Sequence, residues 1–157
     1  MGELKRLVKH CTATPEGREV TSAELRHWHC DPVSKGGRGW KQVGYSDMIH
    51  LNGGVENLVK YDEDDAVDPW EMTNGAKGYN SNSRHVVYVG GLDKSGKTAK
   101  DTRTASQRAA MGEYVRAFLR KHPKAVVCGH RDLPGVQKAC PSFDVKAWMR
   151  EAGILKM

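Results

Sequence analysis

The stretch RHVVYVGG, residues 84–91, decides the fold class. Its apolar run ends at two glycines and predicts a buried strand. Two other segments follow the same pattern. LKRLVKHC, residues 4–11, predicts a first strand that ends near His10, and KAVVCGH, residues 124–130, predicts a short core strand that places His130 at its end.

Other segments predict a hairpin and three helices. GYSDMIHL and VENLVKYD, joined by an NGG turn at 52–54, have the pattern of two paired strands. TSAE at 21–24 and TASQ at 104–107 have the form of capping boxes, and the second opens the helix with the clearest apolar periodicity. Ser142 is the expected cap of a last helix within FDVKAWMREAG.

These elements predict an α/β fold. We expect a single domain over residues 1–157, built on one mixed β-sheet of about five strands with helices packed on its faces. The composition agrees, because 38% hydrophobic and 28% charged residues describe a globular chain rather than a disordered one.

Charge and hydropathy restrict the partners and the location. The net charge of +6 attracts polyanions in general, but the basic residues are scattered, so we expect no specific nucleic-acid partner. No apolar run approaches the roughly 18 residues of a membrane span. The N-terminus MGELKRLVKHC lacks the apolar core of a Sec signal, so we expect synthesis in the cytoplasm.

One nucleotide-binding string needs a structural context that is missing. GLDKSGKT, residues 91–98, matches the P-loop pattern. A P-loop requires a helix to begin at its Lys and Thr, whereas the helical signal here begins only at Thr104. We therefore interpret the string as a turn between extended segments and keep a nucleotide binder only as an alternative.

The loop GHRDLPGVQKACPSFD, residues 129–144, carries the main candidate chemistry. Pro141 disfavours a helical conformation at Cys140, so the preceding chain is expected to be extended. Residues two apart in an extended chain face the same side. Lys138 and Cys140 should therefore point into one pocket.

Three side chains are candidates for one metal ion. His10 and His130 end strands, and Cys140 lies on the loop that follows His130. Alternation along the first strand turns Cys11 toward the opposite face. His10, His130 and Cys140 therefore form a plausible catalytic Zn²⁺ site with three protein ligands and one open position. Lys138 beside it can stabilise an oxyanion.

The order of motifs resembles the zinc-dependent N-acetylmuramoyl-L-alanine amidases. This family includes bacteriophage lysozyme-type amidases and peptidoglycan recognition proteins. The resemblance runs from about Val8 to Trp148 and rests on the following motifs: VKHCTAT, GWKQVGYSDMIH, GAKGYNSNS, VVYVGGLD and GHRDLPGVQKACPSFD.

The resemblance implies a specific reaction. Zinc would be bound by the three side chains named above, Tyr45 and Lys138 would flank it and assist the tetrahedral intermediate, and Asn80 would contact the muramyl-peptide. The implied substrate is the peptidoglycan amide between the lactyl group of N-acetylmuramic acid and L-alanine. We expect an endolysin-like monomer that acts on the cell wall after release. A non-catalytic peptidoglycan-binding module is the main alternative.

Two positions depart from the family pattern, and several histidines are left without a role. Ser46 and Gly75 stand where many relatives have histidine, so substrate preference or pH optimum is expected to differ. His29 lies two positions from His27 on a helix, so the two cannot chelate together. His85 is interpreted as a strand-surface or strand-edge side chain.

Overall fold

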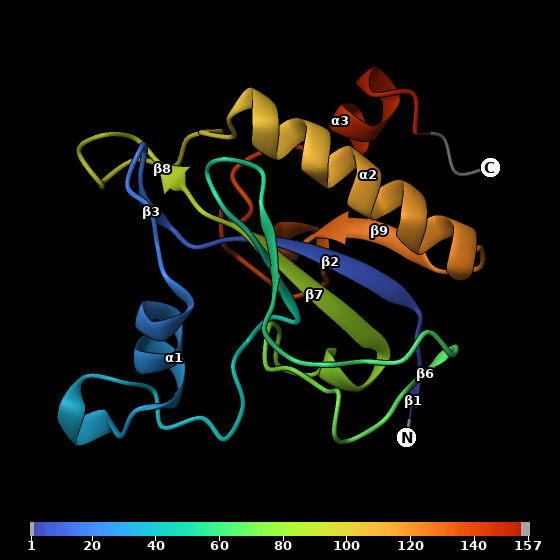
Figure 1. The fold of residues 1–157 in the computed structure, drawn as a ribbon, viewed down its shortest axis with the longest axis horizontal. Helices are drawn as coiled ribbons and strands as arrows, with labels where there is room; N and C mark the ends of the chain where they lie inside the picture. The colour runs from blue at the N-terminus through green and yellow to red at the C-terminus, as the bar shows by residue number, and fades with distance from the viewer. Residues whose placement is uncertain (1, 155–157) are drawn as a thin grey trace.

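A mixed five-stranded sheet forms the centre of the molecule (Figure 1). The computed structural model describes residues 2–154. The strand order is β5-β4-β7-β2-β9, with β4, β7, β2 and β9 parallel and β5 antiparallel to β4. The strands are β2 Arg6–Cys11, β4 Asp47–Ile49, β5 Val55–Asn57, β7 Ser83–Tyr88 and β9 Val126–Gly129. The predicted α/β fold with about five strands is confirmed.

Shorter elements complete the chain. Two small sheets pair β1 (Gly2–Glu3) with β6 (Ala66–Val67) and β3 (Thr14–Pro15) with β8 (Gly91–Leu92). The α-helices of the described part of the chain are α1 Ser22–Cys30, α2 Ala105–Lys121 and α3 Val145–Glu151. Single 3₁₀ turns lie at Val33–Lys35, Asn80–Asn82 and His130–Asp132. Within residues 2–154, no helix has the length and apolar character needed to cross a membrane.

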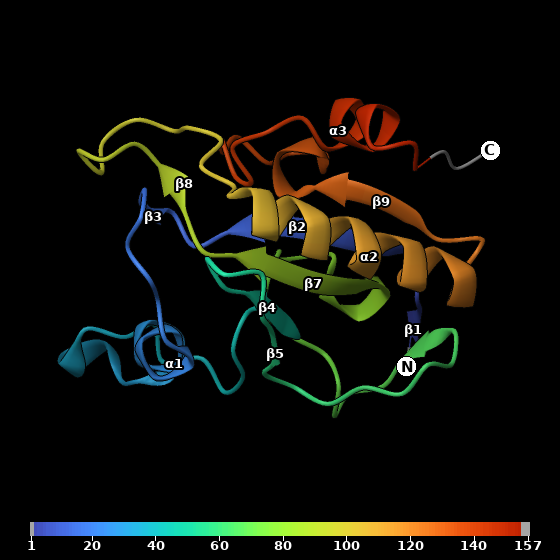
Figure 2. The ribbon, with the colours of Figure 1, turned by 45° about the horizontal axis from the view of Figure 1, so that its top comes forward.

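Helices cover both faces of the sheet. The larger apolar cluster packs α2 and α3 against one face, with Met111, Phe118 and Trp148 among its buried side chains. A second cluster packs Leu25 of α1 against Met48 of β4 on the other side of the sheet. Figures 1 and 2 show α2 and α3 together and α1 apart from them.

Both predicted capping boxes are present, but the predicted cap of the last helix is wrong. The Thr21 and Thr104 hydroxyls accept from the backbone N–H groups of Glu24 and Gln107. The side chains of Glu24 and Gln107 in turn accept from the backbone N–H groups of the two threonines. The cap of α3 is Asp144, whose carboxylate accepts the N–H of Ala147. Ser142 instead donates its hydroxyl to the carbonyl oxygen of Gly91 at 2.9 Å, which ties the loop to β8.

The P-loop-like string forms a turn, as predicted. After β8 the next α-helix begins only at Ala105. The Asp93 carboxylate accepts from the backbone N–H groups of Lys97 and Thr98 and from the Ser95 hydroxyl. These amides are used within the turn, and no helix begins at Lys97 or Thr98 that could hold a phosphate.

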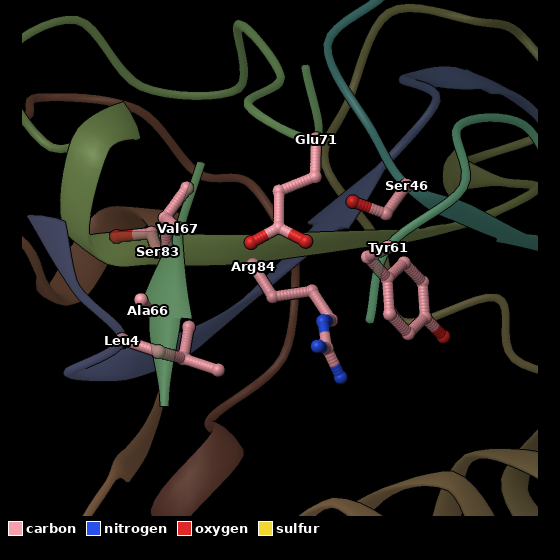
Figure 3. Close-up of a pocket in the computed structure, with 8 residues that line it drawn as sticks. All are labelled: Leu4, Ser46, Tyr61, Ala66, Val67, Glu71, Ser83 and Arg84. Carbon is pink, nitrogen blue, oxygen red and sulfur yellow. The ribbon is translucent and has the colours of Figure 1, made fainter. Parts of the chain in front are cut away.

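The long polar connection between β5 and β7 is organised by one buried carboxylate. Glu71 is 7% exposed and accepts the backbone N–H groups of Asp62 and Asp68. Figure 3 shows its side chain in a small pocket beside Tyr61 and Arg84. The connection is therefore ordered, and its residues 74–78 border the cleft that His130 and Lys138 also line.

Candidate metal centre

Three predicted ligands meet at the carboxyl end of the sheet. His10 is the penultimate residue of β2, and His130 directly follows β9, which pairs in parallel with β2. Cys140 comes from the loop before α3. Their ligand atoms lie within 4.8 Å of one another. Parallel strands place their ends at one edge, which explains how residues far apart in sequence converge there.

The distances fit a single tetrahedral cation. Cys140 Sγ lies 3.8 Å from His10 Nδ1, and the His10 and His130 rings have centroids 4.6 Å apart. Zinc bonds of about 2.1 Å to nitrogen and 2.3 Å to sulfur would separate two tetrahedral ligands by roughly 3.6 Å. The two-histidine, one-cysteine donor set therefore fits Zn²⁺.

Cys11 lies beside this group without joining it. Its side chain is 5% exposed and belongs to the apolar cluster under α2 and α3, as strand alternation predicted. Its backbone N–H points at the Cys140 sulfur, 3.3 Å away. An amide donor at that distance stabilises a thiolate. Among the described residues, the histidine–cysteine group thus offers three ligands.

The protonation states suit metal binding. Burial, together with the neighbouring His85, holds the pKa of His10 well below its ordinary value. Burial and the Lys138 ammonium also lower the pKa of His130. Both rings are therefore neutral near pH 7 and have a free lone pair. A hydrogen bond with the Cys11 thiol and burial raise the pKa of Cys140, so a bound cation is needed to favour its thiolate.

Tyr45 and Lys138 line the cleft beside these ligands. Both border the same pocket as His130 and Cys140. The Tyr45 ring lies 4.9 Å from the His10 ring, and burial raises the pKa of its phenol. Tyr45 therefore keeps its proton and can donate a hydrogen bond. Lys138 is exposed on the loop and borders both parts of the cleft.

Asn80 lies in an adjoining part of the cleft that is strongly basic. The side chains that border this part include Arg38, Lys41 and Lys77, and no carboxylate is among those that the structure describes there. The Asn80 Oδ1 atom accepts the N–H of Ala76 at 2.9 Å. That oxygen already accepts a hydrogen bond from the protein backbone. The predicted contact of Asn80 with a muramyl-peptide stays a prediction.

Two histidines at the site were missed by the sequence analysis. His85 is fully buried, with Nδ1 2.8 Å from His10 Nε2, so its interpretation as a strand-edge residue is wrong. The apolar residues on both faces of its strand could have indicated that His85 is buried, although not that it contacts His10. His29 accepts the Gly44 N–H and packs against Tyr45 in the cleft.

A second group of possible ligands is purely acidic. Carboxylates of Asp62, Asp64, Asp68 and Glu71 lie within ligand distance of one another on the long connection. Glu71 already accepts two backbone N–H groups, and Asp62 and Asp64 are exposed. The histidine–cysteine group, which is more buried and lines a cleft, is the stronger candidate.

Comparisons with known proteins find relatives over most of the chain. The sequence profile of the family described as N-acetylmuramoyl-L-alanine amidase matches residues 2–143. An endolysin of Enterobacteria phage K11 is 34% identical over 148 residues, which cover 94% of this chain and 87% of the relative. An endolysin of Escherichia phage T7 is 35% identical, over 88% of this chain and 81% of its own.

Solved structures share the fold. An endolysin from the Thermus scotoductus bacteriophage Ph2119 superposes with a TM-score of 0.68 and 24% sequence identity. The match covers 98% of this chain and 86% of the other. The sheet and its covering helices therefore belong to an architecture already seen in a phage endolysin.

Proposed function

The chain belongs to the N-acetylmuramoyl-L-alanine amidase family, and on that premise we propose that it is a zinc-dependent hydrolase of peptidoglycan. The proposed reaction cleaves the amide between the lactyl group of N-acetylmuramic acid and L-alanine. One observation carries the proposal: His10, His130 and Cys140 bring their ligand atoms within 4.8 Å of one another beside a basic cleft.

The three side chains would hold the metal from two strands and one loop. When bound there, Zn²⁺ supplies a Lewis acid that polarises a carbonyl group and makes water more acidic. The neutral imidazoles of His10 and His130 are ready to bind, because burial keeps the pKa of each ring low. The N–H of Cys11 supports the Cys140 thiolate.

Lys138 and Tyr45 would act on the reacting carbonyl. The Lys138 ammonium stabilises the negative charge that develops on the carbonyl oxygen during attack by water. The Tyr45 hydroxyl, which keeps its proton because burial raises its pKa, donates a hydrogen bond to the same charge. Both side chains border the pocket that holds the candidate ligands.

The charge of the cleft supports an acidic substrate. Arg38, Lys41 and Lys77 border the part that adjoins the candidate metal site. Peptides that carry free carboxylates, such as those of the cell wall, are attracted to such a surface. Asn80 is proposed to contact the muramyl-peptide in this part of the cleft.

We further propose that the protein works as an endolysin-like monomer, with residues 1–157 as one catalytic domain. It would reach the cell wall after release from the cytoplasm. The net charge of +6 favours accumulation at an anionic wall.

Two measurements on the purified protein test the proposal. Elemental analysis should find about one zinc per chain. Mass spectrometry of digested peptidoglycan sacculi should find free peptides that begin with L-alanine and intact glycan strands. Binding to sacculi without release of peptides would instead identify a non-catalytic peptidoglycan-binding module. Release of other fragments would contradict the proposed bond.

A further inference from the structure

We propose that His85 and Asn80 are positioning residues that fix the tautomer of His10. A buried chain of hydrogen bonds runs from Asn80 through His85 to His10. It places the His10 proton on Nε2 and leaves the lone pair of Nδ1 facing Cys140. The inference rests on the proposed function only in naming zinc as the ion that Nδ1 binds.

The distances define a continuous chain. His85 Nδ1 lies 2.8 Å from His10 Nε2, and His85 Nε2 lies 2.9 Å from Asn80 Oδ1. Both lengths are those of good hydrogen bonds. His10 is 1% exposed and His85 is 0% exposed, so solvent does not compete for their ring nitrogens.

A backbone N–H group sets the donor-to-acceptor direction of these hydrogen bonds. The N–H of Ala76 donates to Asn80 Oδ1 at 2.9 Å, which identifies that atom as an acceptor. His85 Nε2 must therefore carry a proton and donate to it. A neutral imidazole has one N–H, so His85 Nδ1 accepts, and His10 Nε2 must donate.

The result is a His10 ring prepared for a metal on its other nitrogen. With the proton on Nε2, Nδ1 has an unshared pair, and this is the atom that lies 3.8 Å from Cys140 Sγ. Metal-binding histidines commonly donate their second N–H to a partner that fixes ring orientation and tautomer. In this chain the partner is another histidine, which is itself fixed by an asparagine.

Gly75 makes room for this arrangement. A Cβ atom at position 75 would lie 2.4 Å from Cγ of His85, so the ring occupies the space that a side chain there would need. The imidazole itself comes from β7, which pairs in parallel with β2.

These hydrogen bonds also limit which atom of Asn80 is available to a substrate. Its Oδ1 atom already accepts from Ala76 and His85. Any contact between Asn80 and a ligand in the cleft therefore uses the side-chain NH₂ group as a donor. A carbonyl or carboxylate oxygen is the chemistry that such a donor recognises.

A matched pair of substitutions at position 85 tests the inference. His85→Asn places an amide oxygen near the position of Nδ1, where it can accept from His10. His85→Leu has a similar size and cannot accept. We expect His85→Leu to weaken zinc binding by about 10- to 100-fold, and His85→Asn to recover most of the affinity. Zinc affinity is measured by competition with a chromophoric chelator.

A spectroscopic readout separates positioning from simple packing. Nitrogen-15 NMR of the metal-free protein should show His10 protonated at Nε2 in the wild type and in His85→Asn, and a mixed or reversed tautomer in His85→Leu. Asn80→Ala, at a more exposed position, should shift the His85 and His10 tautomers in the same direction. It serves as the second variant if His85→Leu does not fold.

The outcomes distinguish this inference from the proposed function. A His10 ring protonated at Nδ1 in the metal-free wild type overturns the inference, whether or not zinc binds. Unchanged zinc affinity and tautomer in His85→Leu also overturn it, while the zinc site itself stands. Failure of the wild type to bind zinc, with the Nε2–H tautomer present, rejects the metal and leaves the hydrogen-bond chain supported.

Discussion

Lys9 and His10 are neighbours on β2 and are each 1% exposed, but their side chains lie on opposite faces of the strand and have different polar partners. On the cleft face, both ring nitrogens of His10 meet polar partners. On the helix face, the Lys9 ammonium has no hydrogen-bond partner among the described residues and lies over the rings of Tyr114 and Trp148.

The difference shows how burial of a polar group should be interpreted. A buried group whose partners all orient it toward one point indicates a site that is prepared for a ligand. A buried ammonium held only by aromatic rings has lost its hydration and gained weaker contacts, so it lowers stability. We therefore expect substitutions on the cleft face to change chemistry and those on the helix face to change stability.

The largest effect is expected from removal of the cleft-face thiolate. Cys140→Ala should lose zinc and reduce peptide release to background, because two imidazoles alone hold the ion weakly. Cys30→Ala, on α1, is the matched control and should keep both properties. Metal analysis and the sacculus assay check the pair. Full activity in Cys140→Ala would exclude the thiolate as a ligand.

Lys138→Ala should affect the reaction without affecting the metal. We expect kcat to fall by about 10²- to 10³-fold, the usual cost of removing one donor to a developing oxyanion. Zinc content should stay at the wild-type level. Lys94→Ala removes an exposed ammonium from the turn after β8 and should leave kcat unchanged. Wild-type kcat in Lys138→Ala would show that the ammonium does not stabilise the oxyanion.

Lys9→Met should act on stability alone. Burial and the repulsion of Arg103 lower the pKa of Lys9 from 10.5 to about 7. Between these values the unfolded chain binds more protons, so the wild-type free energy of unfolding should rise with pH over that interval. At pH 6 the variant should be more stable by up to about 5 kcal/mol, and the advantage should shrink toward pH 10.

Urea denaturation at several pH values checks this expectation, with Lys94→Met as the exposed control. Zinc affinity of Lys9→Met should match that of the wild type, because the side chain lies on the face opposite to the cleft. A variant that is less stable at pH 6 would show that the aromatic rings compensate for the lost hydration of the ammonium.

The smallest effect is expected at the start of α2. Thr104→Ala removes the side-chain acceptor of the capping box and a hydrogen bond to the carbonyl of Leu51. It should lower the free energy of unfolding by about 1 kcal/mol, seen as a small fall in the melting temperature. Zinc affinity should not change. A parallel loss of zinc affinity would mean that the two faces are coupled.

The sequence predicts the elements of the fold well because their signals are local. Apolar runs and capping boxes locate the central strands and α2 without knowledge of tertiary contacts. Local signals do not identify the cap of α3, because Ser142 and Asp144 are both good capping residues and lie two positions apart. A tertiary bond from Ser142 to Gly91 decides between them.

The candidate site is predictable in part for the same reason. Alternation and strand ends indicate His10, His130 and Cys140, and the spacing to Cys140 indicates Lys138. The family resemblance adds Tyr45 and Asn80. The role of His85 depends on a contact with His10 across 75 residues of sequence, and no local pattern reports it. The aromatic surroundings of Lys9 are hidden in the same way.

The close approach of Gly75 and His85 has an evolutionary consequence. A histidine added at 75 while His85 remains would force two rings into one space, since even a Cβ there would meet the His85 ring at 2.4 Å. Loss of His85 alone would leave a gap beside His10. Each single change is thus expected to be unfavourable, whereas the double change would leave one ring in the same space. Such epistasis predicts that lineages exchange these two residues together.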